Sequence, residues 1–544
     1  MTNLSKKTSV LGFQNAYHLL RRTTYNITKT RIQEFAELSP DQALDLLFTF
    51  SEPFPTRPLN NNKETIIPTT KFPTISDTLK TSDGEDFDKY WWMYQAMKDT
   101  SAQYRIIFWL HLIFITDDDF FSYANLDYRE LLRFHINGSI KDLAVRMTSN
   151  PRMLIYLGNN SNKKNSPNQN YAREFLELYT ILKGPQKATG DYTNYTELDV
   201  QQAAKVFTGI TTNGTTWDKF TRLQLVDSVT KISRGYINPN NHDSSNKTFS
   251  AAFGNATIIG GNTEETIQKE VEDFVSMVFN QDETAKAYCR RLYRYFVGRE
   301  ISTEIENEII IPLAQKLKAD NYQLLPTLRE LLTSKHFYDE NDDQAGDQII
   351  GSLVRGPIEL YFHLFSLLNL QTPLYQDNPG SIHKLMLNIV YNYSQNLGVQ
   401  IFRPQSVNGY AGYSSSPLYD KNFITSSTLR IRYSNTIDLL INGFNYNDYI
   451  YKLNLPQFVK DSGYFTDPSD GNLLVSEFCS LLHIEIPPTE RLTYFQDVFL
   501  GGLSLTNWKM EWNNYTSKGT TAGVKIPIDR LVKALIKSPE FQTF

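Results

Sequence analysis

The chain has 544 residues, of which 40% are hydrophobic and 21% charged, and its formal net charge is −5 with a pI near 6.0. This composition argues against a disordered or coiled-coil protein, and a chain of this length can bury a large core. The negative balance argues against nucleic acid as a partner, because wrapping nucleic acid requires an electropositive field. Cys289 and Cys479 are the only cysteines, so neither a disulfide framework nor a cysteine-based zinc site is expected.

The N-terminal third is predicted to be helical apart from one loop. Helices are expected at 11–22 and 29–48, with a fresh start at Ser39-Pro40-Asp41, and helical regions follow at about 86–116 and 127–148. Between them, five prolines among Asn, Thr and Lys predict an extended surface loop over 51–84.

The strongest apolar run, 106–115, has roughly half the length needed to cross a bilayer, so it predicts a buried helix and no transmembrane segment. The first residues lack the apolar run of a signal peptide, and the expected location is cytoplasmic.

The central region is predicted to contain two further helices. A loop of Gly, Asn, Ser, Lys and Pro over 158–167 leads into a helix at 168–183, which Gly184-Pro185 should stop. Thr196-Glu197-Leu198-Asp199 has the spacing of a capping box and starts a helix that ends at Gly209. From 223 to 261 the chain becomes polar, β-branched and rich in Gly and Asn, which indicates a small β-hairpin or irregular lobe, the only stretch with appreciable β character.

The remainder is again helical, with an irregular Gly/Tyr-rich loop over 403–425 and room for a sub-domain break near 340–350. The fold class is therefore mainly α: one continuous, large multi-helix globular body with a small β-containing insertion near 223–261 and long polar loops. The helices expected in this part are 263–280, 283–297, 301–319, 322–336, 349–368, 380–398, 426–442, 471–483, 488–500 and 527–540.

The densest ionisable cluster lies on the helix predicted at 168–183. Helical periodicity puts Asn170, Arg173, Glu174 and Glu177 on one arc, opposite an apolar face. Arg173 and Glu177 have the spacing of a surface ion pair, so a solvated face is one interpretation. The other is a site: if water were excluded, Glu174 and Glu177 would raise each other's pKa, as acid–base or metal chemistry requires.

Histidines supply the other candidates. His111 is the one strongly polar side chain in the apolar 106–115 run, two residues after Trp109, and is either a core histidine with satisfied nitrogens or a site residue. His135 could join it as a second imidazole.

A loop over 241–247 carries His242, Asp243 and Lys247, and a carboxylate beside an imidazole can orient it as a base or ligand. The asparagine-rich loop at 158–167 contains two lysines and no Asp, so it predicts a flexible polar lid and argues against a calcium site.

These segments together resemble the bacterial family catalogued as domain of unknown function 1800, over nearly the whole chain. Gln169 stands where the family signature usually has Glu, Asn26 where Gly is usual, and Gln405 and Tyr410 where Pro and Trp are usual; Leu110 also separates Trp109 from His111. If the missing carboxylate were a ligand or base, this member would be weakened or inactive. The matching segments are His18–Arg22, Phe108 with Trp109 and His111, Asn168–Glu177, Tyr195–Val200, Phe207–Gly209, the loop from His242 to Lys247, Gly398, Phe402, Pro404, Val407, Gly409 and Ser538–Phe541.

The resemblance implies a context and no established activity. It implies that such proteins are genomic neighbours of the domain of unknown function 1501 family, which is similar to sulfatases and alkaline phosphatases, and that many relatives are destined for the cell envelope. The first hypothesis is therefore a binding or accessory protein that acts with an envelope or phosphatase/sulfatase-like partner.

The alternative is a hydrolase, which could use a divalent metal, with a site gathered from distant segments. Its catalytic candidates are His111, Arg173, Glu174, Glu177, His242 and Asp243, and its substrate-binding candidates are Trp109, His135, Asn168, Asn170 and Lys247.

Overall fold

A computed structural model describes residues 4–66, 87–118, 123–212, 225–340, 348–446, 449–483 and 487–544. Within these ranges the protein is mainly α-helical and carries small two-stranded antiparallel sheets, which confirms the predicted fold class. The apolar faces of the helices share one large hydrophobic core that extends from Leu11 to Phe541.

The N-terminal half contains helices of 5 to 16 residues joined by short 3₁₀ and π turns, labelled η, of which η3 is π-helical. They are α1 (Gly12–Thr23), α2 (Lys29–Ala36), α3 (Pro40–Leu47), α4 (Phe87–Lys98), α5 (Gln103–Ile113), α6 (Tyr123–Phe134), η1 (His135–Asn137), α7 (Ile140–Met147), α8 (Pro151–Tyr156), η2 (Asn159–Ser161), α9 (Asn170–Glu174), η3 (Phe175–Tyr179), α10 (Glu197–Val206), η4 (Pro239–Asn241), η5 (Ala251–Phe253) and α11 (Glu264–Phe279).

The C-terminal half continues in the same manner, with π-helical turns at η6 and η8. Its helices are α12 (Asp282–Phe296), α13 (Thr303–Ile305), η6 (Glu306–Ile310), α14 (Ile311–Ala319), α15 (Leu324–Thr333), η7 (His336–Tyr338), α16 (Pro357–Leu367), α17 (Pro379–Leu385), η8 (Met386–Tyr391), α18 (Asn392–Asn396), α19 (Ala411–Ser414), η9 (Tyr419–Phe423), α20 (Ser426–Asn442), α21 (Leu455–Asp461), α22 (Gly471–Leu482), α23 (Thr489–Leu500), α24 (Leu505–Lys518), α25 (Ala522–Ile536) and α26 (Pro539–Gln542).

Side-chain caps start the helices where the sequence indicates them. Ser39 forms a capping box with Gln42 at α3, and Thr196 forms one with Asp199 at α10. Asn150 accepts hydrogen bonds from the first free amides of α8, just before Pro151. α24 was not predicted, because its Asn, Thr and Trp residues give only a weak apolar stripe.

The predicted β character near 223–261 is present as short ladders. β4 (Tyr236–Ile237) pairs with β3 (Ile210–Thr211), and β5 (Lys247–Thr248) pairs with β6 (Thr257–Ile258). The expectation that no other stretch forms strands was wrong: β1 (Gln186–Ala188) pairs with β2 (Asp191–Tyr192), and β7 (Phe444–Tyr446) with β8 (Tyr449–Tyr451). Strands of two or three residues are too short to show an alternating pattern.

The 168–183 helix is shorter than predicted. The α-helical turns of α9 pass at Phe175 into the π-helix η3, which ends at Tyr179, well before Gly184. At Thr180 the backbone leaves helical geometry, with φ −131° and ψ −99°, and Leu182 has a positive φ of 62°. In a π turn the hydrogen bonds join residues five apart and not four, so the regular helix ends before the chain reaches Gly184.

The predicted loops are only partly within the described residues. The described part of the proline-rich loop, 51–66, is irregular and contacts α4 through the Trp91 indole, which donates to the Pro55 carbonyl at 2.7 Å; residues 67–84 lie outside the described ranges. Most of the predicted 340–350 break, 341–347, also lies outside them. The 403–425 segment contains the short helices α19 and η9.

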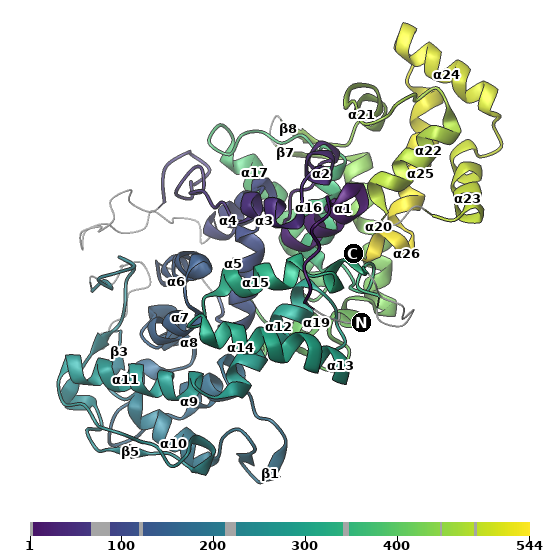
Figure 1. Cartoon of the computed structure of the whole chain (residues 1–544). Coiled ribbons are helices and arrows are strands. Elements are labelled where there is room, and N and C mark those ends of the chain that lie inside the picture. The colour runs from purple at the N-terminus through teal and green to yellow at the C-terminus, as the bar shows by residue number, and fades with distance from the viewer. Residues whose placement is uncertain are drawn as a thin grey trace.

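Figure 1 shows how distant parts of the chain are arranged: α22 to α25 stand at one corner, whereas α9, α10, α11 and β5 lie at the opposite end. The two ends of the chain lie near each other in the middle of the body. Contacts join the N-terminal and C-terminal parts of the chain, since the Tyr17 hydroxyl donates to the Leu481 carbonyl at 2.8 Å and the Arg22 guanidinium stacks 4.7 Å from the Phe544 ring centre.

The central helix α5 is buried along nearly all its length. None of the described helices combines the length and apolar character of a membrane span.

Candidate functional site

The polar arc of α9 and η3 forms ion pairs at the surface, but not the pair that was predicted. Arg173 pairs in bidentate fashion with Glu197 of α10, at 3.0 and 2.9 Å, and also donates to the Gln169 Oε1 at 3.1 Å. The predicted Arg173–Glu177 pair is not among the described ion pairs; Glu177 pairs with Lys183 instead. The π turn changes the angular spacing that the prediction assumed. Gln169 accepts from Arg173 with an amide oxygen, so this contact needs no carboxylate.

Glu174 differs from its neighbours on the arc. It is half-buried, and no hydrogen bond or ion pair reaches its carboxylate from the described residues. Burial and the nearby Glu177 carboxylate raise the pKa of Glu174 to about 7, against the opposing charges of Arg173 and Lys183. Glu177 is better satisfied, since the Tyr195 hydroxyl also donates to it at 3.3 Å.

His111 lies in the core of the body. Its Nδ1 lies 2.8 Å from the Tyr128 hydroxyl, which donates to the Phe114 carbonyl at 2.7 Å, so the imidazole donates at Nδ1. Its Nε2 lies 3.3 Å from the Tyr410 hydroxyl. Burial lowers the pKa of His111 to about 3, so the ring is neutral. This geometry favours the core-histidine interpretation.

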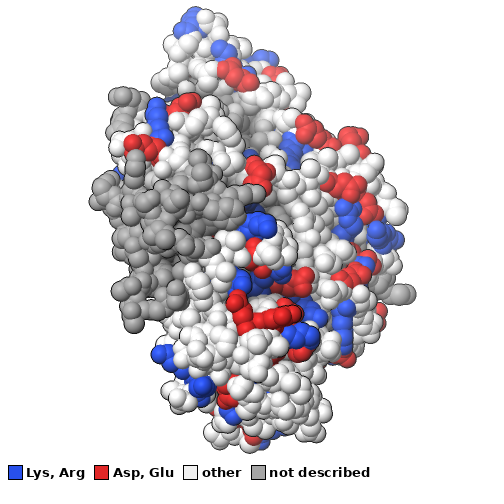
Figure 2. Space-filling model, turned by 90° about the vertical axis from the view of Figure 1, so that its left-hand side faces the viewer, with Lys and Arg blue, Asp and Glu red and all other residues white. Residues whose placement is uncertain are grey.

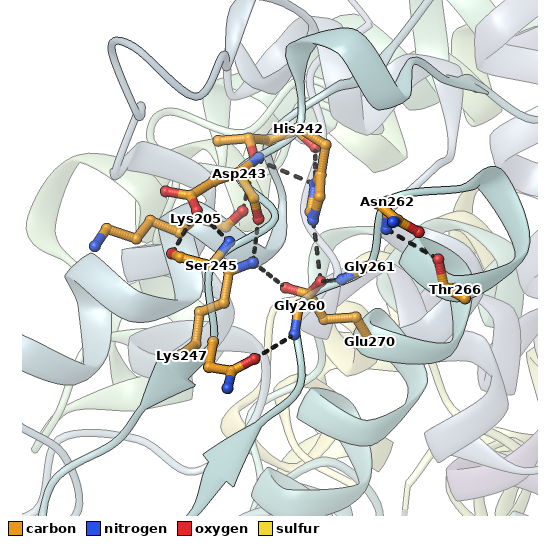
Figure 3. A network of polar contacts seen from close by, with 12 residues as sticks. Lys205, His242, Asp243, Ser245, Lys247, Gly260, Gly261, Asn262, Thr266 and Glu270 are labelled. Atoms are coloured by element: carbon orange, nitrogen blue, oxygen red, sulfur yellow. Dashed lines mark hydrogen bonds and ion pairs between the residues drawn. The ribbon is translucent and has the colours of Figure 1, made fainter.

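His242 belongs to a fully buried network that joins its loop to α11 (Figure 3). The Thr208 hydroxyl donates its proton to the Lys205 carbonyl and therefore cannot donate to His242 Nδ1. That nitrogen donates instead to the Thr208 carbonyl at 2.8 Å. Its Nε2 lies 3.0 Å from one oxygen of Glu270, which also accepts from the Gly261 amide at 2.7 Å.

The second oxygen of Glu270 lies 2.6 Å from Lys247 Nζ, and all three side chains are shielded from solvent. Glu270 was not predicted, because it lies 28 residues from His242 on an otherwise ordinary amphipathic helix.

Asp243 points into a turn beside this network. Its carboxylate accepts from the Ser245 amide at 2.9 Å and from the Ser245 hydroxyl at 2.5 Å. Partial burial disfavours its ionisation, but these hydrogen bonds and the Lys247 and Lys205 charges outweigh it and lower the pKa of Asp243. Asp243 therefore stabilises the loop and does not contact His242 through its side chain in any described hydrogen bond.

The remaining candidates are held by the backbone around them. The Asn168 amide donates to the Gly158 carbonyl at 3.2 Å, and the Asn170 amide to the Leu157 carbonyl at 3.1 Å. Asn162 is buried and its side-chain amide donates to the Ala204 carbonyl of α10 at 2.9 Å, so the 158–167 loop is attached to the body and is not the flexible lid that was expected. Burial and the Arg146 charge lower the pKa of His135 to about 4.

The three predicted groups keep separate partners. Within the described residues, no hydrogen bond or ion pair joins His111, the Arg173–Glu177 arc or the His242 loop. No group of three or more His, Cys, Asp or Glu side chains in the described ranges could hold a metal ion. The catalytic and substrate-binding roles of these residues stay predictions.

A cavity of about 500 Å³ lies elsewhere, between α5, η3, α12, the start of α16 and the 407–423 segment. Trp109 of α5 lines it, as do Leu178 and Leu182 at the end of the unwound helix. Val407 and Gly409, which carry the resemblance in the C-terminal part, line it as well. Segments that match the family pattern therefore meet at this cavity although they are far apart in the chain.

Five arginines line the cavity, and three of them have carboxylate partners. Arg105 pairs with the buried Glu359, and Arg299 pairs with Asp420. Arg290 pairs with both Glu306 and Glu283. These three positive charges are compensated within the protein.

Arg291 and Arg294 have no carboxylate partner among the described residues. Arg291 donates to the Leu178 carbonyl, but its Nη1 is buried without a hydrogen-bond partner, and so is Nε of Arg294, whose guanidinium lies 4.8 Å from the Tyr419 ring centre. Burial lowers the pKa of Arg291 to about 10, which still leaves it charged at neutral pH. The Trp109 indole N–H, also lining the cavity, is likewise buried and unpartnered.

The sequence analysis did not select these arginines. A usable signal was present: no Asp or Glu stands three or four positions from Arg291 or Arg294 on α12, so neither can form an ion pair along its own helix. The surface shows no comparable bias, since Lys and Arg are interspersed with Asp and Glu on the described part of the face in Figure 2.

We expect Glu270→Gln to destabilise the protein by about 3–5 kcal/mol, because it leaves Lys247 as an uncompensated buried charge. Urea unfolding followed by circular dichroism measures the change. Glu272→Gln, on the exposed side of the same helix, is the matched control and should stay within about 0.5 kcal/mol. Equal stabilities of the two variants would contradict this account of the network.

The raised pKa of Glu174 predicts a pH dependence of stability. The folded protein holds a proton that the unfolded chain releases, so the free energy of unfolding falls as the pH rises from about 4.5 to about 7. Glu174→Gln removes this loss, and after solvent screening we expect the variant to be about 1 kcal/mol more stable than the native protein at alkaline pH and equal to it at acidic pH. Thermal unfolding across this range tests the sign; a difference that does not change with pH would refute it.

Comparison with known proteins adds a family and nothing more specific. No curated protein and no solved structure matches the chain. One family model, described as "Protein of unknown function (DUF1800)", matches residues 18–543. This match covers the cavity-lining segments and the predicted polar segments alike, and the chain belongs to this family of proteins of unknown function.

Proposed function

We propose that this protein binds an anionic small molecule with an apolar body in the cavity between α5, α12 and the 407–423 segment. The observation that carries the proposal is the pair of cavity-lining arginines, Arg291 and Arg294, that have no carboxylate partner among the described residues. A cavity of about 500 Å³ is also of the size that small-molecule sites have.

The charge balance supports an anion. A guanidinium stays protonated in proteins, and Arg291 and Arg294 each have a buried N–H without a partner, which is costly. The other three arginines of the cavity show how this protein meets that cost, with Glu359, Asp420 and Glu306 as counter-charges. A bound anion would supply the same compensation to Arg291 and Arg294 and accept from the unpartnered nitrogen of each.

The walls support an apolar body. Trp109, Tyr295, Tyr413, Tyr419 and Phe423 surround the cavity together with leucine and isoleucine side chains. Aromatic rings provide wide apolar contact and stacking surfaces. The unpartnered Trp109 N–H adds one donor, which an acceptor on the ligand would satisfy.

Binding of anilinonaphthalene sulfonate, an anionic aromatic probe, tests the proposal by fluorescence titration. Because each arginine would lose a charge-assisted hydrogen bond, we expect Arg291→Gln and Arg294→Gln to weaken binding at least about tenfold. Lys286→Gln, the same charge change on α12 outside the cavity, should bind like the native protein. Equal affinity in all four proteins would refute the proposal.

The accessory role expected from the family resemblance fits this ligand class. Sulfatase- and phosphatase-like enzymes act on anionic esters and release anionic products, so a protein that binds such anions could serve a partner of the domain of unknown function 1501 family. Support for the partner comes from the resemblance alone. We expect the two native proteins to co-purify from cells that express both, and we expect Arg291→Gln or excess free sulfate to weaken this association. Failure of the native proteins to co-purify would remove the partner from the proposal.

The hydrolase hypothesis keeps one supporting observation, the Glu174 carboxyl with a pKa of about 7, which suits general acid–base catalysis. Binding is the better supported function, because the cavity gathers unpartnered donors and Glu174 does not line it.

A further inference from the structure

A second polar corner lies in the same cavity, on the side of α16. Glu359 is only 1% exposed and uses one oxygen for its ion pair with Arg105. Its other oxygen, Oε2, is buried with no hydrogen-bond partner among the described residues, and the Tyr413 hydroxyl is in the same situation. Both residues line the cavity. The two unpartnered groups are an acceptor and a donor, in contrast to the donors of Arg291 and Arg294.

These two groups converge on one place beside Gly356. A Cβ at position 356 would come within 2.4 Å of the Tyr413 hydroxyl and 2.5 Å of Glu359 Oε2. Gly356 is therefore the residue that leaves room for both groups at the cavity wall, and any larger side chain there would displace them. Because Gly356 is also the N-cap of α16, the backbone fixes the position of Glu359 in the first turn.

The chemistry of this corner matches a neutral hydroxyl. Burial and the nearby Tyr295 raise the pKa of Tyr413, although Arg105 lowers it, so the phenol keeps its proton and can donate. Glu359 Oε2 can only accept when ionised, and a hydroxyl both accepts from a phenol and donates to a carboxylate. An ammonium group fits less well, because Arg105 already neutralises the Glu359 charge and adds repulsion.

We infer that the ligand carries a hydroxyl group in addition to its anionic group, and that Glu359 and Tyr413 bind this hydroxyl while Arg291 and Arg294 bind the anion. The inference rests on the proposed function and narrows it to hydroxylated organic anions. It also explains why a cavity with mostly apolar walls has unpartnered hydrogen-bond donors on α12 and an unpartnered acceptor at the start of α16.

Matched pairs of aryl anions test this by isothermal titration calorimetry of the full chain. The probes are benzoate against meta- and para-hydroxybenzoate, and phenylacetate against its meta- and para-hydroxy derivatives. In the native protein we expect at least one hydroxylated member to bind about tenfold tighter than its parent, because it satisfies two buried groups that the parent leaves unpaired.

Tyr413→Phe keeps the ring and removes only the hydroxyl. It should reduce the preference to about twofold or less, whereas Arg291→Gln should weaken the binding of both members of each pair by the same factor and so keep the preference. The same cycle with Tyr419→Phe, whose ring also lines the cavity, is the control and should retain the preference.

The outcomes separate the two proposals. If the anions bind in an arginine-dependent manner but hydroxylated and parent members bind equally, the inference is overturned and the proposed function stands. A preference that persists in Tyr413→Phe also overturns it, because the hydroxyl is then bound elsewhere. If none of these anions binds and anilinonaphthalene sulfonate shows no arginine dependence, both proposals fail.

Discussion

Charged side chains inside this helical body must find a counter-charge or a hydrogen-bond partner, because transfer of an unpaired charge out of water is costly. Three buried arrangements meet this requirement: Arg105 with Glu359, Arg129 with Asp88 and Asp118, and Lys247 with Glu270. Each joins elements that are distant in the sequence. Charge compensation therefore ties α5 to α16, α6 to α4, and β5 to α11, whereas two arginines of α12 that line the cavity have no carboxylate partner among the described residues.

The cavity depends on ion pairs for its shape. Arg105 and Glu359 hold α5 against α16. Asp420 of the 407–423 segment pairs with Arg299 and also accepts from the Val354 amide at 2.6 Å, which holds this segment against the loop before α16. Asp420 and Glu359 also line the cavity, but their carboxylates pair with Arg299 and Arg105, so Arg291 and Arg294 of α12 have no carboxylate partner among the described residues. The positive character of the cavity is thus a property of α12, and its walls are supplied by the other elements.

The π-helical turn connects the polar arc to this cavity. It unwinds the helix before Gly184, so that Leu178 and Leu182 reach the cavity wall and the Leu178 carbonyl accepts from Arg291. The same turn places Glu177 against Lys183 and Tyr195 and leaves Glu174 without a partner in the described part of the chain. One local departure from α-helical geometry therefore affects both the surface arc and Arg291 of the cavity.

By itself the sequence determined the helical class, most helix positions, the caps at Ser39, Asn150 and Thr196, and the family, because apolar periodicity, capping residues and motif order are local signals. It also selected Trp109, which lines the cavity, but as part of a different group. Only the tertiary structure decided which polar residues meet. Glu270 with His242, Glu197 with Arg173, and Glu359 with Arg105 are pairs formed across the fold, and sequence spacing carries no information on them. The unpaired state of Arg291 and Arg294 is decided in the same way: the sequence around them excludes an ion pair along α12, but whether a carboxylate reaches them from another element depends on everything packed around them.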